Sequence, residues 1–161
     1  VIMFQEEFAQ RLSARPGDTL YCRLSVNTQL LARVDQLMRV GRGNFRPPPK
    51  VDSRVVRIEL KNPPPPVNFV EWDGLVKLCF NRKNKTLRSL FTSKKVIADL
   101  ETSWKTFAAL RGSSGDTPDV KAMVEEVVAE ERFDGKRPAK MDQDDFLALL
   151  VAFNAKGLHF T

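Results

Sequence analysis

The sequence predicts an α/β fold in which a small sheet comes first and an all-helical part follows. Three observations support this prediction. Before residue 62, the apolar run of residues 1–4 indicates a buried strand. Residues 32–40, with imperfect alternation, and residues 51–58, with polar residues interleaved among apolar and β-branched ones, indicate strands buried on at least one face. Four consecutive prolines, residues 63–66, then exclude both a helix and a central strand. After them, apolar residues recur at helical spacing.

The sheet-forming part is expected to span residues 1–62. Pro16, Gly17 and Asp18 have the chemistry of a turn and end the first helix. Ser25 is expected to be the N-cap of the second helix. The strands are expected at residues 1–5, 32–40 and 51–60, and the helices at residues 6–14 and 25–31.

The helical part is expected to span residues 63–161. Asn68 is expected to cap its first helix, and Thr117 is expected to cap a later helix with Pro118 at the first position. Residues 112–115 are expected to form a loop. The helices are expected to carry residues 69–80, 87–91, 96–107, 120–128 and, after Asp142, residues 146–153.

A proline-rich loop, residues 44–50, joins the second and third expected strands. Its three prolines hold φ at about −65° and remove three backbone donors, so the loop is expected to be stiff. It places Phe45 at the mouth of the sheet, where a ring suits stacking on a base taken out of its helix. The alternative is that Phe45 is a core aromatic and that the prolines only stiffen the loop. The basic residues around the ring are Arg42, Arg46, Lys50 and Arg54.

The net charge of +6 is unevenly distributed along the chain. Seven Lys and Arg residues and no acid lie between residues 77 and 95, whereas residues 116–161 hold six basic and ten acidic residues. A basic run of this kind indicates a directed nucleic-acid surface, and the alternative is an ordinary solvated helix face. The seven are Lys77, Arg82, Lys83, Lys85, Arg88, Lys94 and Lys95.

Few residues offer other chemistry. Cys22 and Cys79, the only cysteines, have neither disulfide nor zinc spacing, which favours a reducing compartment. His159 is the only histidine and is expected to be a packing or surface residue. Asp142 does not open a calcium loop, because Leu147 stands where such a loop needs glycine. A membrane span needs an apolar run of about 18 residues, which the sequence lacks, so no membrane contact is predicted.

Several motifs together resemble one family. Residues 44–58, Asn-Phe-Arg-Pro-Pro-Pro-Lys-Val-Asp-Ser-Arg-Val-Val-Arg-Ile, resemble the late motif of the KsgA-type rRNA adenine dimethyltransferases, where a Phe and a proline-rich run open the last strand of the catalytic domain. Residues 4–12 are similar to that family's post-catalytic strand and helix, and residues 21–25 to its Tyr-x-Arg-Leu-Ser segment. Residues 82–87 and 141–146 look like the eukaryotic branch, the 18S rRNA dimethyladenosine transferases.

The resemblance implies that residues 1–62 are the last strands of a Rossmann-like methyltransferase sheet and that residues 63–161 form a small, all-helical, RNA-binding C-terminal domain. It implies transfer of two methyl groups from S-adenosylmethionine to each of two adjacent adenosines in small-subunit rRNA. Phe45 matches the aromatic residue that stacks on the target base, with Arg46 and Lys50 beside it. The implied partners are small-subunit rRNA and pre-ribosomal particles, in the nucleus and nucleolus, with late steps in the cytoplasm.

The family's glycine-rich cofactor loop, its acidic residue for the ribose and its Asn-Leu-Pro-Tyr motif have no match in the sequence. We therefore expect that an N-terminal portion is absent and that this piece alone is inactive, with no catalytic, cofactor-binding or metal-binding residue. Its truncated sheet edge is expected to self-associate or to be poorly ordered. One alternative function is a non-catalytic, RNA-binding module of ribosome assembly. A third is a protein-interaction domain with an incidental basic face.

Overall fold

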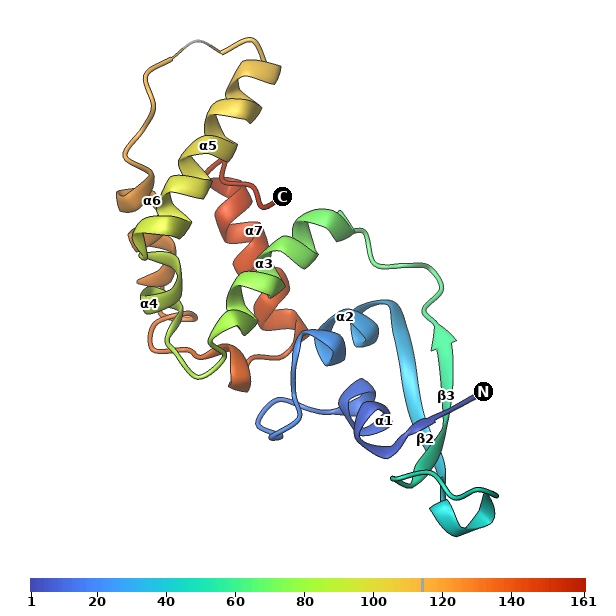
Figure 1. The fold of residues 1–161 in the computed structure, drawn as a ribbon. Helices are drawn as coiled ribbons and strands as arrows, with labels where there is room; N and C mark the ends of the chain where they lie inside the picture. The colour runs from blue at the N-terminus through green and yellow to red at the C-terminus, as the bar shows by residue number, and fades with distance from the viewer. Residues whose placement is uncertain (114) are drawn as a thin grey trace. The chain divides into compact units, whose positions relative to one another are not determined.

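The computed structural model describes residues 1–113 and 115–161. The chain divides into two compact units, Val1–Pro66 and Val67–Thr161 (Figure 1). The division falls at the end of the proline run. Each unit has its own buried apolar side chains. The loop expected at residues 112–115 lies partly outside the described residues.

The first unit is built on a three-stranded sheet with the strand order β1-β3-β2. β1 (Ile2–Gln5) and β2 (Ala32–Val40) both pair antiparallel with β3 (Ser53–Leu60), which therefore lies in the middle (Figure 1). All three expected strands are confirmed, but β3 begins later than expected. Val51 and Asp52 belong to the preceding loop, because the Asp52 side chain bonds back to the backbone of that loop.

Two helices pack on the sheet. α1 (Glu6–Ser13) contacts β2 and β3, and α2 (Arg23–Leu31) packs against α1 and β2. On the edge strand β1, by contrast, Ile2 and Met3 are 49% and 48% exposed, and the expected self-association through this edge stays a prediction. The buried apolar residues of the unit are Ala9, Leu12, Ala14, Tyr21, Val26, Leu30, Ala32 and Val56.

The expectation that Ser25 is the N-cap of α2 is wrong. The helix begins at Arg23 with Cys22 as its N-cap, so Ser25 occupies the third helical position. The Cys22 backbone N–H donates to Ser25 Oγ at 3.2 Å, and the Ser25 hydroxyl donates to the carbonyl of Arg11 in α1. Ser25 is 0% exposed, so its hydroxyl joins two helices in the interior.

The second unit is all-helical, and its core is dominated by aromatic side chains. The rings of Phe91 and Phe153 lie 5.0 Å apart, and those of Trp72 and Phe146 lie 6.3 Å apart. All four side chains are completely buried. The helices are α3 (Phe69–Asn81), α4 (Leu87–Phe91), α5 (Lys94–Leu110), α6 (Val120–Val128) and α7 (Gln143–Ala155).

Side-chain caps fix most of these helix starts. Asn68 accepts hydrogen bonds from the first N–H groups of α3, as predicted. Asp142 caps α7 and exchanges hydrogen bonds with Asp145, which confirms that these acids serve the helix N-terminus. The expected start of α6 is wrong: Asp119 is its N-cap instead of Thr117, because the Asp119 carboxylate accepts an N–H of the first turn at 3.1 Å.

Gly74 in α3 allows the C-terminal segment to pack closely. A Cβ at this position would lie 3.2 Å from the Cβ of Phe160 and 3.3 Å from its carbonyl carbon. Phe160 is 3% exposed, and its ring contacts those of Phe91 and Phe153. The ring is therefore held by the core and has little room to move away from α3.

We predict that Gly74→Val lowers the free energy of unfolding of the second unit by about 1–3 kcal/mol, since overpacking displaces the neighbours of a filled site. Urea denaturation followed by tryptophan fluorescence measures this, because both tryptophans, Trp72 and Trp104, lie in that unit. Gly43→Val is the matched control, as a Cβ there meets nothing within 4 Å. An unchanged urea midpoint for Gly74→Val contradicts the prediction.

Candidate nucleic-acid interface

The Phe45 loop, residues 41–52, lies at the end of the sheet where β1 and β2 both finish. Ser53, the first residue of β3, pairs with the last residues of both neighbouring strands. A 3₁₀ turn at Arg42–Asn44 begins the loop, and the Phe45 N–H donates to the Arg42 carbonyl at 3.3 Å. The aromatic ring therefore follows directly from an ordered turn at the sheet end.

The carboxylate of Asp52 closes this loop. Its Oδ1 accepts the Arg42 backbone N–H at 2.8 Å, and its Oδ2 pairs with the guanidinium of Arg39 on β2. The Asp52 carbonyl also accepts the Glu6 N–H at 3.0 Å, which bonds the loop to the start of α1. The hydrogen bond from the Arg42 backbone, and then that from Arg39, lower the pKa of the Asp52 carboxyl below its usual value. One ionised side chain thus joins both ends of the loop.

A second carboxylate, Glu6, holds the neighbouring arginines. Arg54 donates to Glu6 Oε1 from Nε at 3.2 Å and from Nη2 at 3.1 Å, and Arg39 Nε lies 3.6 Å from the same oxygen. Arg54, expected from the sequence beside Phe45, is therefore half-buried and engaged within the protein. Neither Arg39 nor Asp52 was predicted from the sequence to belong to the site. Arg39 pairs with Arg54 across the β2–β3 ladder, and two opposed arginines need carboxylates between them.

The Phe45 side chain is half-buried, whereas the three basic residues on its loop are exposed. These are Arg42, Arg46 and Lys50. Arg42 also donates from Nη1 to the Lys50 carbonyl at 3.4 Å. A partly accessible ring on a loop fixed at both ends is the arrangement that base stacking requires. Phe45 is thus not a fully buried core aromatic, and its stacking role stays a prediction.

The basic run of the second unit spreads over three helices and the turn between two of them. Six of its seven residues are exposed, while Lys83 is half-buried in the turn after α3, where its carbonyl accepts the Ala139 N–H at 2.9 Å. Three of the exposed cations line a groove of about 1060 Å³ bounded by α3, α4, α5 and the C-terminal residues. The groove cations are Lys77, Arg82 and Lys95, and the outer cations are Lys85, Arg88 and Lys94.

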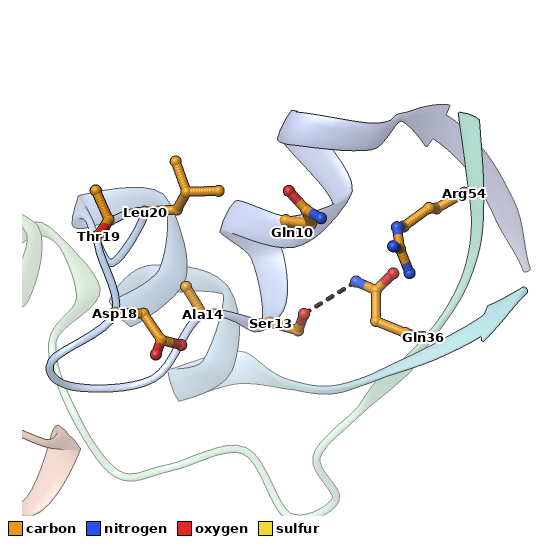
Figure 2. A pocket seen from close by; sticks show the side chains of 8 residues that line it. All are labelled: Gln10, Ser13, Ala14, Asp18, Thr19, Leu20, Gln36 and Arg54. Atoms are coloured by element: carbon orange, nitrogen blue, oxygen red, sulfur yellow. Dashed lines mark hydrogen bonds between the residues drawn. The ribbon is translucent and has the colours of Figure 1, made fainter. Parts of the chain in front are cut away.

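A smaller pocket of about 340 Å³ lies in the first unit between α1, the turn that follows it and the sheet (Figure 2). Gln36 spans part of it, because its Nε2 donates to Ser13 Oγ at 2.9 Å and to the Ala9 carbonyl at 2.7 Å. Arg54 points toward Gln36 from β3, but its charge is paired with Glu6. Gln36 and Arg54 thus have partners within the protein, and we assign no ligand to this pocket.

Among the described residues, neither the glycines nor the His, Cys, Asp and Glu side chains form a recognised cofactor or metal motif. Gly41 and Gly43 form the one Gly-x-Gly sequence, directly after β2, but they lead into a 3₁₀ turn and prolines instead of the helix that would face a cofactor. Residues 1–113 and 115–161 hold no group of three His, Cys, Asp or Glu side chains placed around a metal position. No helix among those residues is long and apolar enough to cross a membrane.

The remaining reactive side chains lie at a helix cap, in the core or against neighbouring side chains. Cys22 and Cys79 are free thiols, and burial raises the pKa of the Cys79 thiol. His159 Nδ1 lies 2.9 Å from Glu71 Oε1, and its ring lies 4.3 Å from that of Phe107. This confirms the interpretation of His159 as a packing residue.

A run of exposed cations on the second unit and an anchored loop with a partly accessible aromatic ring are both features found in proteins that bind nucleic acids. A family model described as "Ribosomal RNA adenine dimethylase" matches residues 1–112. The chain belongs to the ribosomal RNA adenine dimethylase family.

Individual relatives agree with this assignment. The chain is 56% identical to "Probable dimethyladenosine transferase" of Dictyostelium discoideum, over 99% of this chain and 52% of that protein. It is 45% identical to "Ribosomal RNA small subunit methyltransferase" of Arabidopsis thaliana, over 100% of this chain and 58% of that protein. The crystal structure of a dimethyladenosine transferase from Plasmodium falciparum matches 99% of this chain and 58% of its own, with 40% identity and a TM-score of 0.91. The chain thus spans about half the length of the curated relatives it matches.

We predict that Asp52→Asn loosens the Phe45 loop and leaves the sheet folded, because it weakens the bonds to Arg39 and to the Arg42 N–H. The pH dependence of the loop's stability follows from the lowered pKa of the Asp52 carboxyl. The carboxylate stabilises the loop above the ordinary Asp value of about 4, and this stabilisation is lost as pH falls through its lower folded-state pKa. In NMR spectra, the Arg42 and Phe45 amide signals should therefore move in acid, and move at neutral pH in Asp52→Asn.

The matched control is Asp144→Asn, which removes an exposed carboxylate from the first turn of α7. It should leave the Phe45 loop signals unchanged. Equal shifts of the Arg42 and Phe45 amides in the two variants contradict the role given to Asp52.

Proposed function

We propose that this chain is the C-terminal part of an S-adenosylmethionine-dependent enzyme that dimethylates two adjacent adenosines in small-subunit rRNA. Membership of the family supports the reaction class. The names of the relatives, dimethyladenosine transferase and ribosomal RNA small subunit methyltransferase, support the substrate. The observation that carries the proposal is the anchored loop with Phe45 at the end of the sheet.

In this proposal the loop binds and orients the target adenine. Phe45 offers a ring face to a base taken out of its stack, a contact worth about 1–3 kcal/mol. Arg46 and Lys50 are exposed on the same loop and contact the flanking phosphates. Because Asp52 fixes the loop before RNA arrives, little conformational entropy is lost when the base stacks.

The methyl donor and the groups that orient the adenine amine are held by residues outside this chain. S-adenosylmethionine supplies the methyl groups, and the Gly41–Gly43 turn offers no cradle for it. The three strands are then the last strands of a Rossmann-like methyltransferase sheet. The half-exposed Ile2 and Met3 on the edge strand β1 support the pairing of further strands, or of a second copy, at that edge. The chain alone therefore binds RNA without transferring methyl groups.

The second unit supplies the RNA-binding surface through its outer cations, Lys85, Arg88 and Lys94. The eukaryotic sequence motifs support a place in pre-ribosomal particles, in the nucleus and nucleolus with late steps in the cytoplasm. A non-catalytic module of ribosome assembly would use the same surface. The two functions differ in whether residues outside this chain carry out methyl transfer.

We predict that Phe45→Ala in the full-length enzyme lowers kcat/KM for rRNA methylation by roughly 10- to 100-fold, since a stacking contact of about 1–3 kcal/mol corresponds to about one to two decades in rate. The fold stays intact because the ring is half-buried. Methyl incorporation into small-subunit rRNA measures the effect. Phe8→Ala is the matched control, at a 42% exposed ring outside the loop. Unchanged turnover together with a lower melting temperature contradicts the stacking role.

We predict that the outer cations dominate binding of single-stranded RNA. The triple variant Lys85→Glu, Arg88→Glu, Lys94→Glu should weaken RNA binding. It should also make the slope of log K against log[salt] less negative by about 2, since each lost phosphate contact on a single strand contributes about 0.7. Fluorescence anisotropy with an rRNA-like oligonucleotide at several salt concentrations measures both. The control is Lys121→Glu with Lys156→Glu, two cations already paired with glutamates. Salt-independent binding, or an equal loss in the control, overturns the prediction.

A further inference from the structure

The groove of the second unit is cationic at one end and apolar at the other. The groove cations come from the C-terminal end of α3 and the first turn of α5, and Asp99 is the one acid among the described residues that line it. Farther along α5 the lining holds no Lys or Arg: the hydroxyl side chains of Thr102, Ser103 and Thr106 come first, and then the apolar Phe107 and Leu110. His159, Phe160 and Thr161 of the C-terminal segment complete it. With three cations and one acid, the groove carries a net charge of +2 (3 − 1), confined to one end.

Both ends of the groove have unused binding capacity. Among the described residues, none of the groove cations forms an ion pair, so each keeps its full charge for a ligand. At the apolar end, Leu110 is 78% exposed. Unpaired charge next to exposed apolar surface in a concave site is the composition of a binding groove.

We propose that this groove binds an amphipathic helical segment of a partner protein, acidic at its N-terminal end and apolar along one face. The acidic end lies against the groove cations, and the apolar face packs on Leu78, Val96 and Leu110. Acidic residues are also favoured at the N-terminus of the bound helix by its own macrodipole, which sets the direction in which it lies. A helix in an apolar groove is a common mode of peptide recognition.

The dimensions of α5 set the length of the segment. Lys95 and Leu110 mark the two ends of the groove along this helix. At about 1.5 Å per residue they lie about 22 Å apart, which a helix of about 15 residues matches. An acidic cluster in the first turn of such a segment reaches the groove cations while its last two turns cover Leu110.

The lining favours a peptide over an RNA strand. A nucleic-acid strand carries a phosphate on every nucleotide, so it needs cations along its whole path. The described lining at the apolar end offers none. Proteins that bind single strands also present aromatic faces for stacking. Here the apolar side chains are mostly aliphatic, and His159 already lies 4.3 Å from the Phe107 ring.

This partner site is independent of methyl transfer and uses cations other than those assigned to RNA. The experiment selects from a displayed library of random 15-residue peptides on the purified chain and measures the affinity of the enriched peptides by fluorescence anisotropy. The enriched peptides should share acidic residues in the first turn and Leu, Ile, Met or Phe at i, i+4 and i+7. Lys77→Glu with Lys95→Glu, and separately Leu110→Asp, should each weaken their binding at least 10-fold.

Matched substitutions outside the groove are Lys121→Glu, and Val151→Asp on α7, where the side chain is 64% exposed. These should leave peptide affinity unchanged, and the urea midpoint of every variant confirms that it is folded. The proposal is overturned if no common pattern is enriched, or if the control variants weaken binding as much as the groove variants. It is also overturned if Leu110→Asp weakens single-stranded RNA binding, since the groove then belongs to RNA.

Discussion

The position of Phe45 depends on the negative charge of one side chain, Asp52. The loop between β2 and β3 is rich in proline and glycine, so it cannot extend the ladder of hydrogen bonds that holds the sheet. Its prolines fix φ locally but do not fix the direction in which the loop leaves the sheet. That direction is set where Asp52 accepts the Arg42 N–H and pairs with Arg39, while its carbonyl accepts the Glu6 N–H. These bonds fix the position of the Phe45 ring, although its loop makes no strand pairing of its own.

The elements of the fold follow from local patterns, and their exact starts follow from tertiary bonds. An apolar run, two alternating stretches and helical spacing predicted the three strands and the described helices that carry the core, although the first strand, expected to be buried, is largely exposed. The errors concern which neighbouring polar residue is the cap. Ser25 does not cap α2 because its hydroxyl, in the third helical position, donates to the carbonyl of Arg11 in α1. Asp119 caps α6 in place of Thr117, because its carboxylate accepts an N–H of the first turn. The choice of cap thus depends on a partner distant in sequence at Ser25 and on local side-chain chemistry at Asp119.

In the candidate site, too, some features were predicted from the sequence and others depend on the fold. A proline-rich run after an aromatic residue was visible in the sequence, and so was a stretch of cations without acids. The pairing of Asp52 with Arg39, and of Glu6 with Arg54, was not, because it depends on the strand register that sets Arg39 opposite Arg54. Nor does the linear order of the basic run show which cations line the groove, because helix orientation and the turn after α3 separate them.

The two sets of cations are close enough along the chain to influence one another. Lys94 belongs to the outer set and Lys95 to the groove set, and they are consecutive residues in the first turn of α5. Exposed charges interact over about 8 Å at physiological ionic strength, and the Cα atoms of Lys94 and Lys95, as consecutive residues, lie about 3.8 Å apart, although their side chains leave the helix in different directions. An acidic segment bound in the groove therefore lowers the positive potential at a phosphate near Lys94 and weakens the binding of RNA there. By linkage, bound RNA weakens the binding of the segment by the same free energy. Because the apolar end adds binding that salt does not screen, high ionic strength shifts this competition toward the protein partner.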